Sequence, residues 1–399
     1  MARSHARGLP ATMVVLMLGG GCTAPASAQH RADATPAPAA LTPPRPGTPP
    51  GPSAAVAVPP PPAAPVSRLW PFTRLYNVDY VDVRAIAERY GLKAAWVTSG
   101  RVMQLSDERG RVRLKFEDRS RDFYLDGVRV FMGETTVFHK ASLYVSKVDV
   151  IKTVAPLLRP AERPDLLPRP PKLIVLDPGH GGNDPGNQNT LLHLDEKDLT
   201  LDVVQRLKKL LEARGYAAVL TRPDDRRVEL EERANIAARA KADLFLSVHF
   251  NALPAAVAGR VTGAETYALT PQFQRSSGDE KKDKRAELAF PGNRLDYANV
   301  VLGYNLHRTL LADLKSSDRG YKRARYIVLC YAECPAALVE AAFLSNNGEA
   351  RRLSTPEYRQ QIAQAIADGV DAYAAALAAV HPPPAPAPPE THPPNAASP

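Results

Sequence analysis

Cysteine is scarce in this 399-residue chain, which contains only Cys22, Cys330 and Cys334. A structural zinc site needs four ligands, and the closely spaced pair Cys330 and Cys334 has no second pair to complete one. The four-residue spacing leaves two alternatives, a tight disulfide or two separate, partly buried thiols. The chain also lacks an arginine-rich helix and interleaved aromatic and basic residues, so its composition gives no indication of a nucleic-acid partner.

Long apolar runs are also missing at the N-terminus. The apolar residues 11–18 fall short of the roughly 20 residues that a membrane-spanning helix needs. A basic start and the small residues Ala-Ser-Ala at 26–28 surround this run, which predicts a signal peptide over residues 1–28. Lipidation of Cys22 is the alternative, and only lipidation predicts attachment to a membrane. Either process predicts an exported protein of the periplasm or cell envelope.

Proline, in contrast, is plentiful. Of the 39 prolines, 23 lie in residues 24–66 and 381–399. Such segments are extended and have no core, so we expect a linker over residues 29–66 and a disordered tail over residues 381–399. A second, shorter linker is predicted at residues 161–171.

Residues 67–160 predict a small α+β domain. Helical spacing over residues 81–90 precedes short alternating runs separated by turns such as Asp126-Gly127, and a second helix is expected at 147–158. The predicted strands are 94–97, 102–105, 112–116, 123–125, 128–131 and 143–145. This order resembles the domain at the N-terminus of copper amine oxidases, which implies an accessory stalk or wall-binding role. The domain carries 17 Lys and Arg against 11 Asp and Glu, which favours a surface that faces anionic envelope polymers.

Residues 172–380 have a different rhythm, in which strands alternate with helices of ten to twenty residues. The predicted strands are 173–176, 217–221, 244–249, 264–269, 326–329 and 337–339, and the predicted helices are 197–214, 230–241, 295–314 and 358–378. This alternation predicts an α/β fold with a mainly parallel sheet covered by helices on both faces. Sites in such sheets collect at the carboxyl ends of the strands.

Four polar residues fall at such positions. His180 follows the first strand in a Gly-rich loop, Glu196 opens the first helix, and His249 and Glu340 end two buried strands. Two imidazoles and one carboxylate that leave a fourth position open are the ligand pattern of a catalytic zinc ion. A second carboxylate would then be available for proton transfer.

Structural interpretations exist for each of these residues. His180 could cap a turn, Glu196 could favour the helix dipole, and His249 could be a core residue. Glu340 is harder to explain in this way, because a lone buried carboxylate is costly.

Other polar residues near this set have weaker signals. Asp177 and Asn251 could orient the ligands or could form local turns. His193 and His307 have no motif around them and are interpreted as surface or helix-face residues.

The motifs that contain these residues resemble those of the zinc-dependent N-acetylmuramoyl-L-alanine amidases, in family order over about residues 172–373. The matching stretches are 175–186, 194–201, 247–252, 318–329 and 335–346. The resemblance implies that His180, Glu196 and His249 bind Zn²⁺ and that Glu340 is the catalytic carboxylate. The implied reaction is hydrolysis of the amide bond between N-acetylmuramic acid and L-alanine in peptidoglycan, and the resemblance admits a protein activator.

Two functions other than the amidase are compatible with parts of this pattern. One is another zinc amide hydrolase of the cell wall, such as a carboxypeptidase or deacetylase. The other is a non-catalytic peptidoglycan-binding protein, which the retention of all four site residues argues against.

The segment 271–293 follows the predicted strand 264–269, whose end we expect near the metal. It is either a solvated surface loop or a lid that gates the site.

Overall fold

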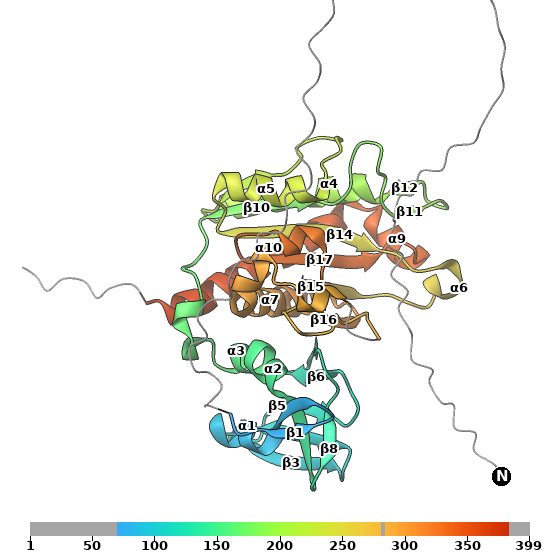
Figure 1. Ribbon diagram of the computed structural model, residues 1–399. Coiled ribbons are helices and arrows are strands. Elements are labelled where there is room, and N and C mark those ends of the chain that lie inside the picture. Colours follow the sequence, from blue (N-terminus) through green and yellow to red (C-terminus); the bar gives the residue numbers. More distant parts are fainter. Residues whose placement is uncertain (1–69, 281–283, 383–399) are drawn as a thin grey trace, which may run out of the picture. The chain divides into compact units, whose positions relative to one another are not determined.

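The computed structural model describes residues 70–280 and 284–382. The predicted signal peptide, Cys22, the linker over 29–66 and nearly all of the C-terminal tail lie outside these residues. The described residues belong to one compact unit (Figure 1). None of its helices is long and apolar enough to cross a bilayer.

The first part of the described chain is built of short strands and helices. Its strands are β1 (Thr73–Leu75), β2 (Val78–Asp82), β3 (Lys93–Thr98), β4 (Val102–Ser106), β5 (Val112–Glu117), β6 (Asp122–Leu125), β7 (Val128–Phe131), β8 (Val137–His139) and β9 (Ser142–Ser146). Its helices are α1 (Val83–Arg89), α2 (Lys147–Asp149) and α3 (Ala155–Leu158). A π-helical turn, Val150–Val154, joins α2 to α3 where one continuous helix was predicted.

The second part is larger and alternates strands with longer helices. Its strands are β10 (Leu173–Pro178), β11 (Gln188–Asn189), β12 (Leu194–Asp195), β13 (Ala217–Leu220), β14 (Leu244–Asn251), β15 (Ala264–Leu269), β16 (Asp318–Ala324) and β17 (Ala336–Phe343). Its helices are α4 (Glu196–Ala213), α5 (Leu230–Ala240), α6 (Ala255–Ala258), α7 (Asp296–Leu314), α8 (Ile327–Cys330), α9 (Asn347–Leu353) and α10 (Pro356–Val380).

One strand was predicted in the wrong place. Residues 326–329 were expected to be a strand, but the strand is β16, and Ile327–Cys330 form the helix α8. The sequence of β16 contains three cationic residues, and Lys322 and Arg323 are buried in it. Such a strand does not show the apolar enrichment that marks buried strands, which is why it was missed.

The predicted α/β fold with a mainly parallel sheet is confirmed. Strands β13, β10, β14 and β17 are parallel neighbours in that order. Strand β15 then runs antiparallel to β17, and β16 runs parallel to β15. Helices α4 and α7 contact the sheet and each contacts α10, while α5 contacts β10 and α8 contacts β15 and β17.

The sheet does not end at β16. Tyr321 of β16 pairs in parallel with Val130 of β7, and β7, β6, β5, β4 and β3 follow as an antiparallel series. The two parts of the chain on either side of residues 161–171 therefore contribute to one 11-stranded sheet. The remaining strands of the first part form a separate sheet, in the order β1-β2-β9-β8.

One face of this long sheet is mainly apolar. A single hydrophobic cluster includes Phe116 on β5, Val130 on β7, Tyr321 on β16, Val339 on β17 and Val248 on β14. Successive residues of a strand point to opposite faces. The residues next to these in each strand therefore lie on the other face of the sheet, which carries the polar groups described below.

The reversed direction of β15 decides where its flanking loops lie. Glu265, near the start of β15, pairs with Glu340, so Leu269 and the segment 271–293 lie toward the opposite edge of the sheet. There, Arg121 donates to the carbonyls of Ser276 and Asp279, both at 2.8 Å, and Gln274 donates to Asp149 at 2.8 Å. The expectation that β15 ends near the candidate metal site is therefore wrong, and the described residues of the segment contact the first part of the chain.

Candidate functional site

The His180 loop begins where β10 ends. His180 has a φ of +62°, a left-handed conformation that is uncommon for a non-glycine residue, and Gly181 and Gly182 continue with positive φ. The backbone closes on itself, because the N–H of Gly181 donates to Asp184 O at 3.0 Å and the N–H of Asp184 donates back at 3.2 Å. Arg233 of α5 donates to the carbonyl of His180 at 2.8 Å. These contacts hold the imidazole at the edge of the sheet.

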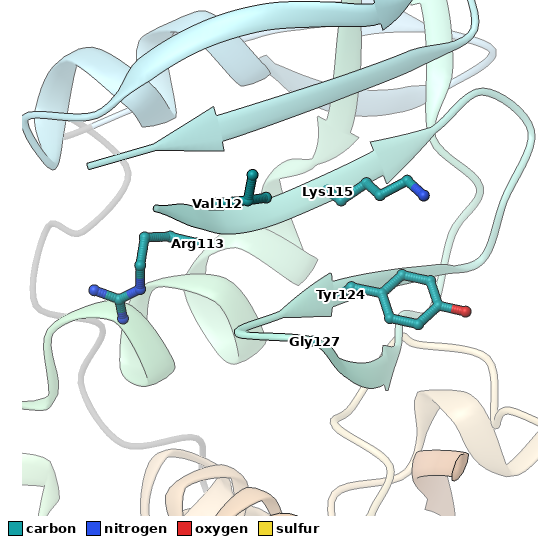
Figure 2. Close-up of a pocket in the computed structure, with 5 residues that line it drawn as sticks. All are labelled: Val112, Arg113, Lys115, Tyr124 and Gly127. Atoms are coloured by element: carbon teal, nitrogen blue, oxygen red, sulfur yellow. The ribbon is translucent and has the colours of Figure 1, made fainter. Parts of the chain in front are cut away.

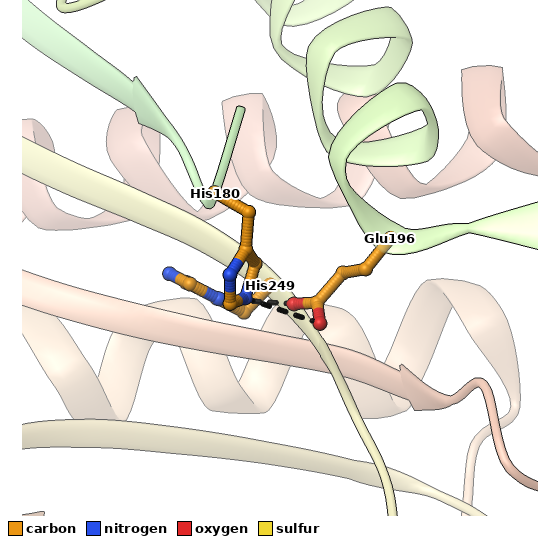
Figure 3. Close-up of side chains that lie close together, drawn as sticks. All are labelled: His180, Glu196 and His249. Atoms are coloured by element: carbon orange, nitrogen blue, oxygen red, sulfur yellow. Dashed lines mark hydrogen bonds and ion pairs between the residues drawn. The ribbon is translucent and has the colours of Figure 1, made fainter. Parts of the chain in front are cut away.

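Glu196 is the first residue of α4 and is 1% exposed. Its carboxylate accepts the backbone N–H groups of Asn187 at 2.8 Å and of Phe250 at 3.0 Å. Figure 3 shows the side chain extending from the start of the helix toward both histidines. Oε2 of Glu196 lies 3.2 Å from Nε2 of His180, and Oε1 lies 3.0 Å from Nδ1 of His249.

These three residues form a candidate metal centre. One potential ligand atom from each of His180, Glu196 and His249 lies within 4.8 Å of the others. Zinc–ligand bonds of about 2.0–2.2 Å in a tetrahedral site place neighbouring ligand atoms about 3.3 Å apart. The two separations between Glu196 and the histidines, 3.0 and 3.2 Å, are close to this value. The donor set therefore fits a catalytic zinc ion.

Two glycines leave the space that these side chains occupy. A Cβ on Gly179 would lie 2.3 Å from Cε1 of His249. A Cβ on Gly186 would lie 2.6 Å from Cδ2 of His180 and 2.8 Å from Oε2 of Glu196. Because real Cβ atoms do not approach other atoms so closely, any other residue at either position would displace a candidate ligand.

Electrostatics keeps Glu196 ionised and His180 basic. Burial raises the pKa of the Glu196 carboxyl, but hydrogen bonds and charge interactions with His180 and His249 outweigh this and lower it below its usual range. Burial likewise lowers the pKa of His180, but Glu196 and then Asp184 raise it to about 9. The Nδ1 atom of His180 lies 2.9 Å from Oδ2 of Asp184, so Asp184 holds the ring in place from its other side.

Glu340 lies beside this centre. In the sheet it pairs with His249 of β14 on one side and with Glu265 of β15 on the other. Its Oε2 atom is buried and has no hydrogen-bond partner among the described residues. Burial, followed by the negative charges of Glu196 and Glu265, raises the pKa of the Glu340 carboxyl well above its usual range, and Lys322 opposes this shift. A carboxyl group in this state can exchange a proton with a neighbouring molecule.

Sequence reasoning missed three charged residues at this site. Asp184 stood in the Gly-rich loop, four residues after His180, and that spacing was a usable signal. Glu265 is a lone carboxylate in an otherwise uncharged strand, and it accepts hydrogen bonds from Tyr267 at 2.6 Å and Asn251 at 3.0 Å. Lys322 pairs with Glu265 at 2.5 Å. It was not recognised as a residue of the site because β16 was not predicted.

Asp177 and Asn251 do not orient the candidate ligands through side-chain hydrogen bonds. The carboxylate of Asp177 accepts from Thr221, Arg233 and Ser247, and Asn251 donates to Glu265. Asp177 therefore stabilises the sheet and, through Arg233, the His180 loop.

Two further histidines and the two described cysteines lie outside the candidate metal centre. His193 is exposed. His307 is a buried residue of α7 that contacts Thr266 at 3.2 Å and Asp318 at 2.9 Å. Cys330 and Cys334 are both buried, and no disulfide joins them.

Residues 174–372 match the family model described as N-acetylmuramoyl-L-alanine amidase. N-acetylmuramoyl-L-alanine amidase LytC of Bacillus subtilis is 37% identical over 201 residues, which are 50% of this chain and 35% of LytC. N-acetylmuramoyl-L-alanine amidase AmiA of Escherichia coli is 31% identical over 225 residues, which cover 51% of this chain and 76% of AmiA.

A solved structure is also similar to part of the chain. It is N-acetylmuramoyl-L-alanine amidase AmiC2 of Nostoc punctiforme, with 32% sequence identity and a TM-score of 0.41. The similarity covers 50% of this chain and 96% of the AmiC2 chain. All three similarities concern about half of the chain, and the matched span contains His180, Glu196, His249 and Glu340.

Proposed function

The chain belongs to the N-acetylmuramoyl-L-alanine amidase family, and from this premise we propose that it is a zinc-dependent hydrolase of peptidoglycan. The bond cleaved is the amide between the lactyl group of N-acetylmuramic acid and the L-alanine of the stem peptide. One observation carries the proposal. One buried oxygen of Glu340 has no hydrogen-bond partner in the described part of the chain, and it stands beside three converging side chains whose donor set suits zinc.

In the proposed site, His180, Glu196 and His249 hold the ion. When bound, zinc supplies Lewis acidity, which polarises a carbonyl and lowers the pKa of water toward about 7. Asp184 fixes the ring of His180 through Nδ1, and the backbone N–H groups of Asn187 and Phe250 fix the carboxylate of Glu196. These contacts set the ligands in place before the substrate arrives.

Glu340 is the proposed proton carrier. As a carboxylate, it accepts a proton from the water that attacks the lactyl carbonyl. The same carboxyl group then donates this proton to the departing amine of L-alanine, so that no net proton is consumed. Its raised pKa suits this role, because a more basic carboxylate accepts a proton from water more readily than an ordinary one.

A direct test uses purified sacculi as substrate. The protein should release free stem peptides that begin with L-alanine, and a chelator should stop the release until zinc is restored. Release of a terminal amino acid from the stems would instead indicate a carboxypeptidase, and release of acetate a deacetylase. Absence of any product from a folded, zinc-loaded protein would leave only peptidoglycan binding.

The ligand assignment is tested by metal analysis. We expect about one zinc per chain, and strongly reduced zinc in His180→Ala and His249→Ala. His193→Ala is the matched control, because this histidine is exposed and lies outside the candidate metal centre. Undiminished zinc in both ligand variants would contradict the assignment.

Export is part of the same proposal, because the substrate lies outside the cytoplasm. The basic start, short apolar run and Ala-Ser-Ala sequence within residues 1–28 support it. N-terminal sequencing of the protein secreted by its native host would distinguish cleavage after Ala28 from processing at Cys22.

A further inference from the structure

Strand β16 carries a β-bulge beside the candidate site. Where β15 advances by two residues, β16 advances by three, so Glu265 faces both Arg319 and Gly320. Gly320 has a φ of +100°, which glycine adopts more readily than other residues. Tyr321 belongs to the apolar cluster, and regular alternation would place Arg319 on that same face. The bulge instead turns Arg319 toward the polar face, on which Glu265 and Glu340 lie.

The contacts of Arg319 agree with this orientation. Its guanidinium lies 5.8 Å from the ring centre of Phe343, the last residue of β17. Glu340 pairs with His249 of β14. Phe343 pairs with Asn251, two residues further along β14, and residues two apart on a strand share a face. Arg319 therefore reaches the catalytic face at the edge of the sheet that holds Glu340.

The protein uses the charge of Arg319 only in part. Its Nε atom is buried and has no hydrogen-bond partner among the described residues. Its ion pair with Glu265 is long, with 3.8 Å between Nε and Oε1. That oxygen is already bound by Lys322 at 2.5 Å, and the other accepts from Tyr267 and Asn251. Glu265 is therefore occupied, and Arg319, whose side chain is 34% exposed, keeps N–H groups for another carboxylate.

Arg113 provides a contrast on the same sheet. It lines a depression of about 320 Å³ in the first part of the chain, together with Val112, Lys115, Tyr124 and Gly127 (Figure 2). Its Nε and Nη2 atoms donate to the two oxygens of Asp126, at 2.5 and 3.1 Å. The side chains of Arg113 and Arg319 are exposed to a similar extent, 27% and 34%. Arg113 thus has a carboxylate that matches its guanidinium, whereas Arg319 has none within the described part of the chain.

A guanidinium with unused N–H groups is suited to a carboxylate, which it can bind through two parallel hydrogen bonds. The proposed substrate presents carboxylates on its stem peptides. A carboxylate on the residue that follows L-alanine lies about 5 Å from the cleaved bond along an extended peptide. Strand β15 separates β16 from β17, so two strand spacings place the backbones of Arg319 and Glu340 roughly 10 Å apart. The Arg319 side chain leans across Glu265 into this interval, which suits a carboxylate at that position.

We propose that Arg319 binds the carboxylate of the stem-peptide residue that follows L-alanine, and that it selects stems in which this carboxylate is free over stems in which it is amidated. Arg319 is then a specificity-determining residue, and the transfer of the proton remains with Glu340. The inference rests on the proposed function for the identity of the substrate.

The test compares two synthetic ligands, both N-acetylmuramoyl-L-alanyl-D-glutamate with an amidated side chain. The α-carboxyl group of the glutamate is free in one and amidated in the other. Binding is measured by titration calorimetry on the zinc-loaded full chain with Glu340→Gln, so that neither ligand is cleaved. We expect the carboxylate ligand to bind about tenfold more tightly than the carboxamide ligand.

Adding Arg319→Gln should remove this preference by weakening the binding of the carboxylate ligand alone. A merely structural role of Arg319 would weaken both ligands equally. Adding Arg319→Lys in its place should keep part of the preference, because an ammonium retains the charge but lacks the planar fork of the guanidinium. The matched control adds Arg260→Gln, which removes an exposed cation from the connection between β14 and β15 at the same edge of the sheet. This control should keep the full preference.

An unchanged preference in the Arg319→Gln protein, or its loss in the Arg260→Gln protein, would overturn the proposal. Equal binding of the two ligands by the Glu340→Gln protein would overturn it as well. Because every binding measurement uses inactive protein, failure of the hydrolase proposal would appear separately, as absence of free stem peptides when the unmodified chain is incubated with sacculi.

Discussion

Two buried carboxylates on the catalytic face of the sheet differ in how their oxygens are used. Asp177 on β10 accepts hydrogen bonds from Thr221 at 2.6 Å, Ser247 at 2.7 Å and Arg233 at 2.8 Å, and both of its oxygens are occupied. Glu340 on β17 leaves one buried oxygen without any partner among the described residues. Burial of either carboxylate is unfavourable because it removes water, but only Asp177 has hydrogen bonds within the protein that offset this desolvation for both of its oxygens.

This difference separates support from chemistry. A fully bonded carboxylate such as Asp177 fixes strands and loops and has no capacity left for a substrate. An unbonded one beside candidate metal ligands keeps a position for a molecule that the protein does not itself supply. The comparison therefore predicts opposite effects. Substitution of Glu340 should remove activity and keep stability, whereas substitution of Asp177 should lower stability.

The largest effect is expected at Glu340. Glu340→Gln keeps the shape of the side chain but removes proton transfer, so turnover of sacculi should fall by about 10²–10⁴-fold. Zinc content and thermal stability should be retained, because the change removes an unpaired buried carboxyl. A comparable loss of zinc, or activity near that of the unmodified protein, would place the proton carrier elsewhere.

Asp177 should show the reverse pattern. Asp177→Asn leaves the guanidinium of Arg233 buried without its counter-charge, which should lower the free energy of unfolding by about 3–5 kcal/mol. Urea denaturation followed by circular dichroism measures this. The control is Asp79→Asn, which breaks an ion pair with Arg74 at the surface and should cost at most about 1 kcal/mol. Equal losses in the free energy of unfolding of the two variants would contradict the supporting role given to Asp177.

Asp184 is expected to have an intermediate effect, confined to the metal. Asp184→Asn removes the charged partner of Nδ1 of His180, and zinc affinity should fall by about 10–100-fold. Competition with a zinc-binding dye gives the dissociation constant. Asp224→Asn changes an exposed carboxylate that pairs with Arg226, and its affinity should match that of the unmodified chain.

The smallest effect concerns the pH dependence of catalysis. Glu340 must be ionised to accept a proton, so activity should be present above its pKa and lost as the pH falls through it. The negative charge of Glu265 contributes to the raised pKa of Glu340. Glu265→Gln should therefore lower that pKa and move the acid limb of the kcat profile to lower pH.

Glu349→Gln is the control for this prediction. Glu349 is a buried carboxylate whose oxygens accept the N–H groups of Gly263 and Phe343, and it does not neighbour Glu340 in the sheet. Its acid limb should coincide with that of the unmodified protein. A shift of the Glu265→Gln profile to higher pH would contradict the assignment of Glu340 as the base.

Much of the second part of the fold could be predicted from the sequence, because its strands and helices are marked by apolar runs of clear period. The buried runs around His249 and Glu340 predicted β14 and β17, although both strands continue a few residues further than expected, to Asn251 and Phe343. His180, Glu196 and His249 lie together as the positions of their motifs suggested.

The missed features depend on pairing, which local sequence does not encode. The direction of β15 follows from its partners, since six buried residues read the same for a parallel or an antiparallel strand. Lys322 and Glu265 neutralise each other across two strands, so each looks misplaced when its own strand is considered alone. The continuation of the sheet through Val130 and Tyr321 joins residues almost two hundred positions apart.

The reversal of β15 also determines where added length in this chain would have consequences. The connection between β14 and β15, residues 252–263, enters β15 at the edge that holds Glu265 and Glu340. Residues inserted there would lie next to Glu265 and Glu340. Residues inserted after Leu269 would lie next to the contacts with Arg121 and Asp149. The antiparallel strand thus separates two positions for insertions. An insertion before β15 can alter turnover, and an insertion after β15 can alter the contacts between the two parts of the chain.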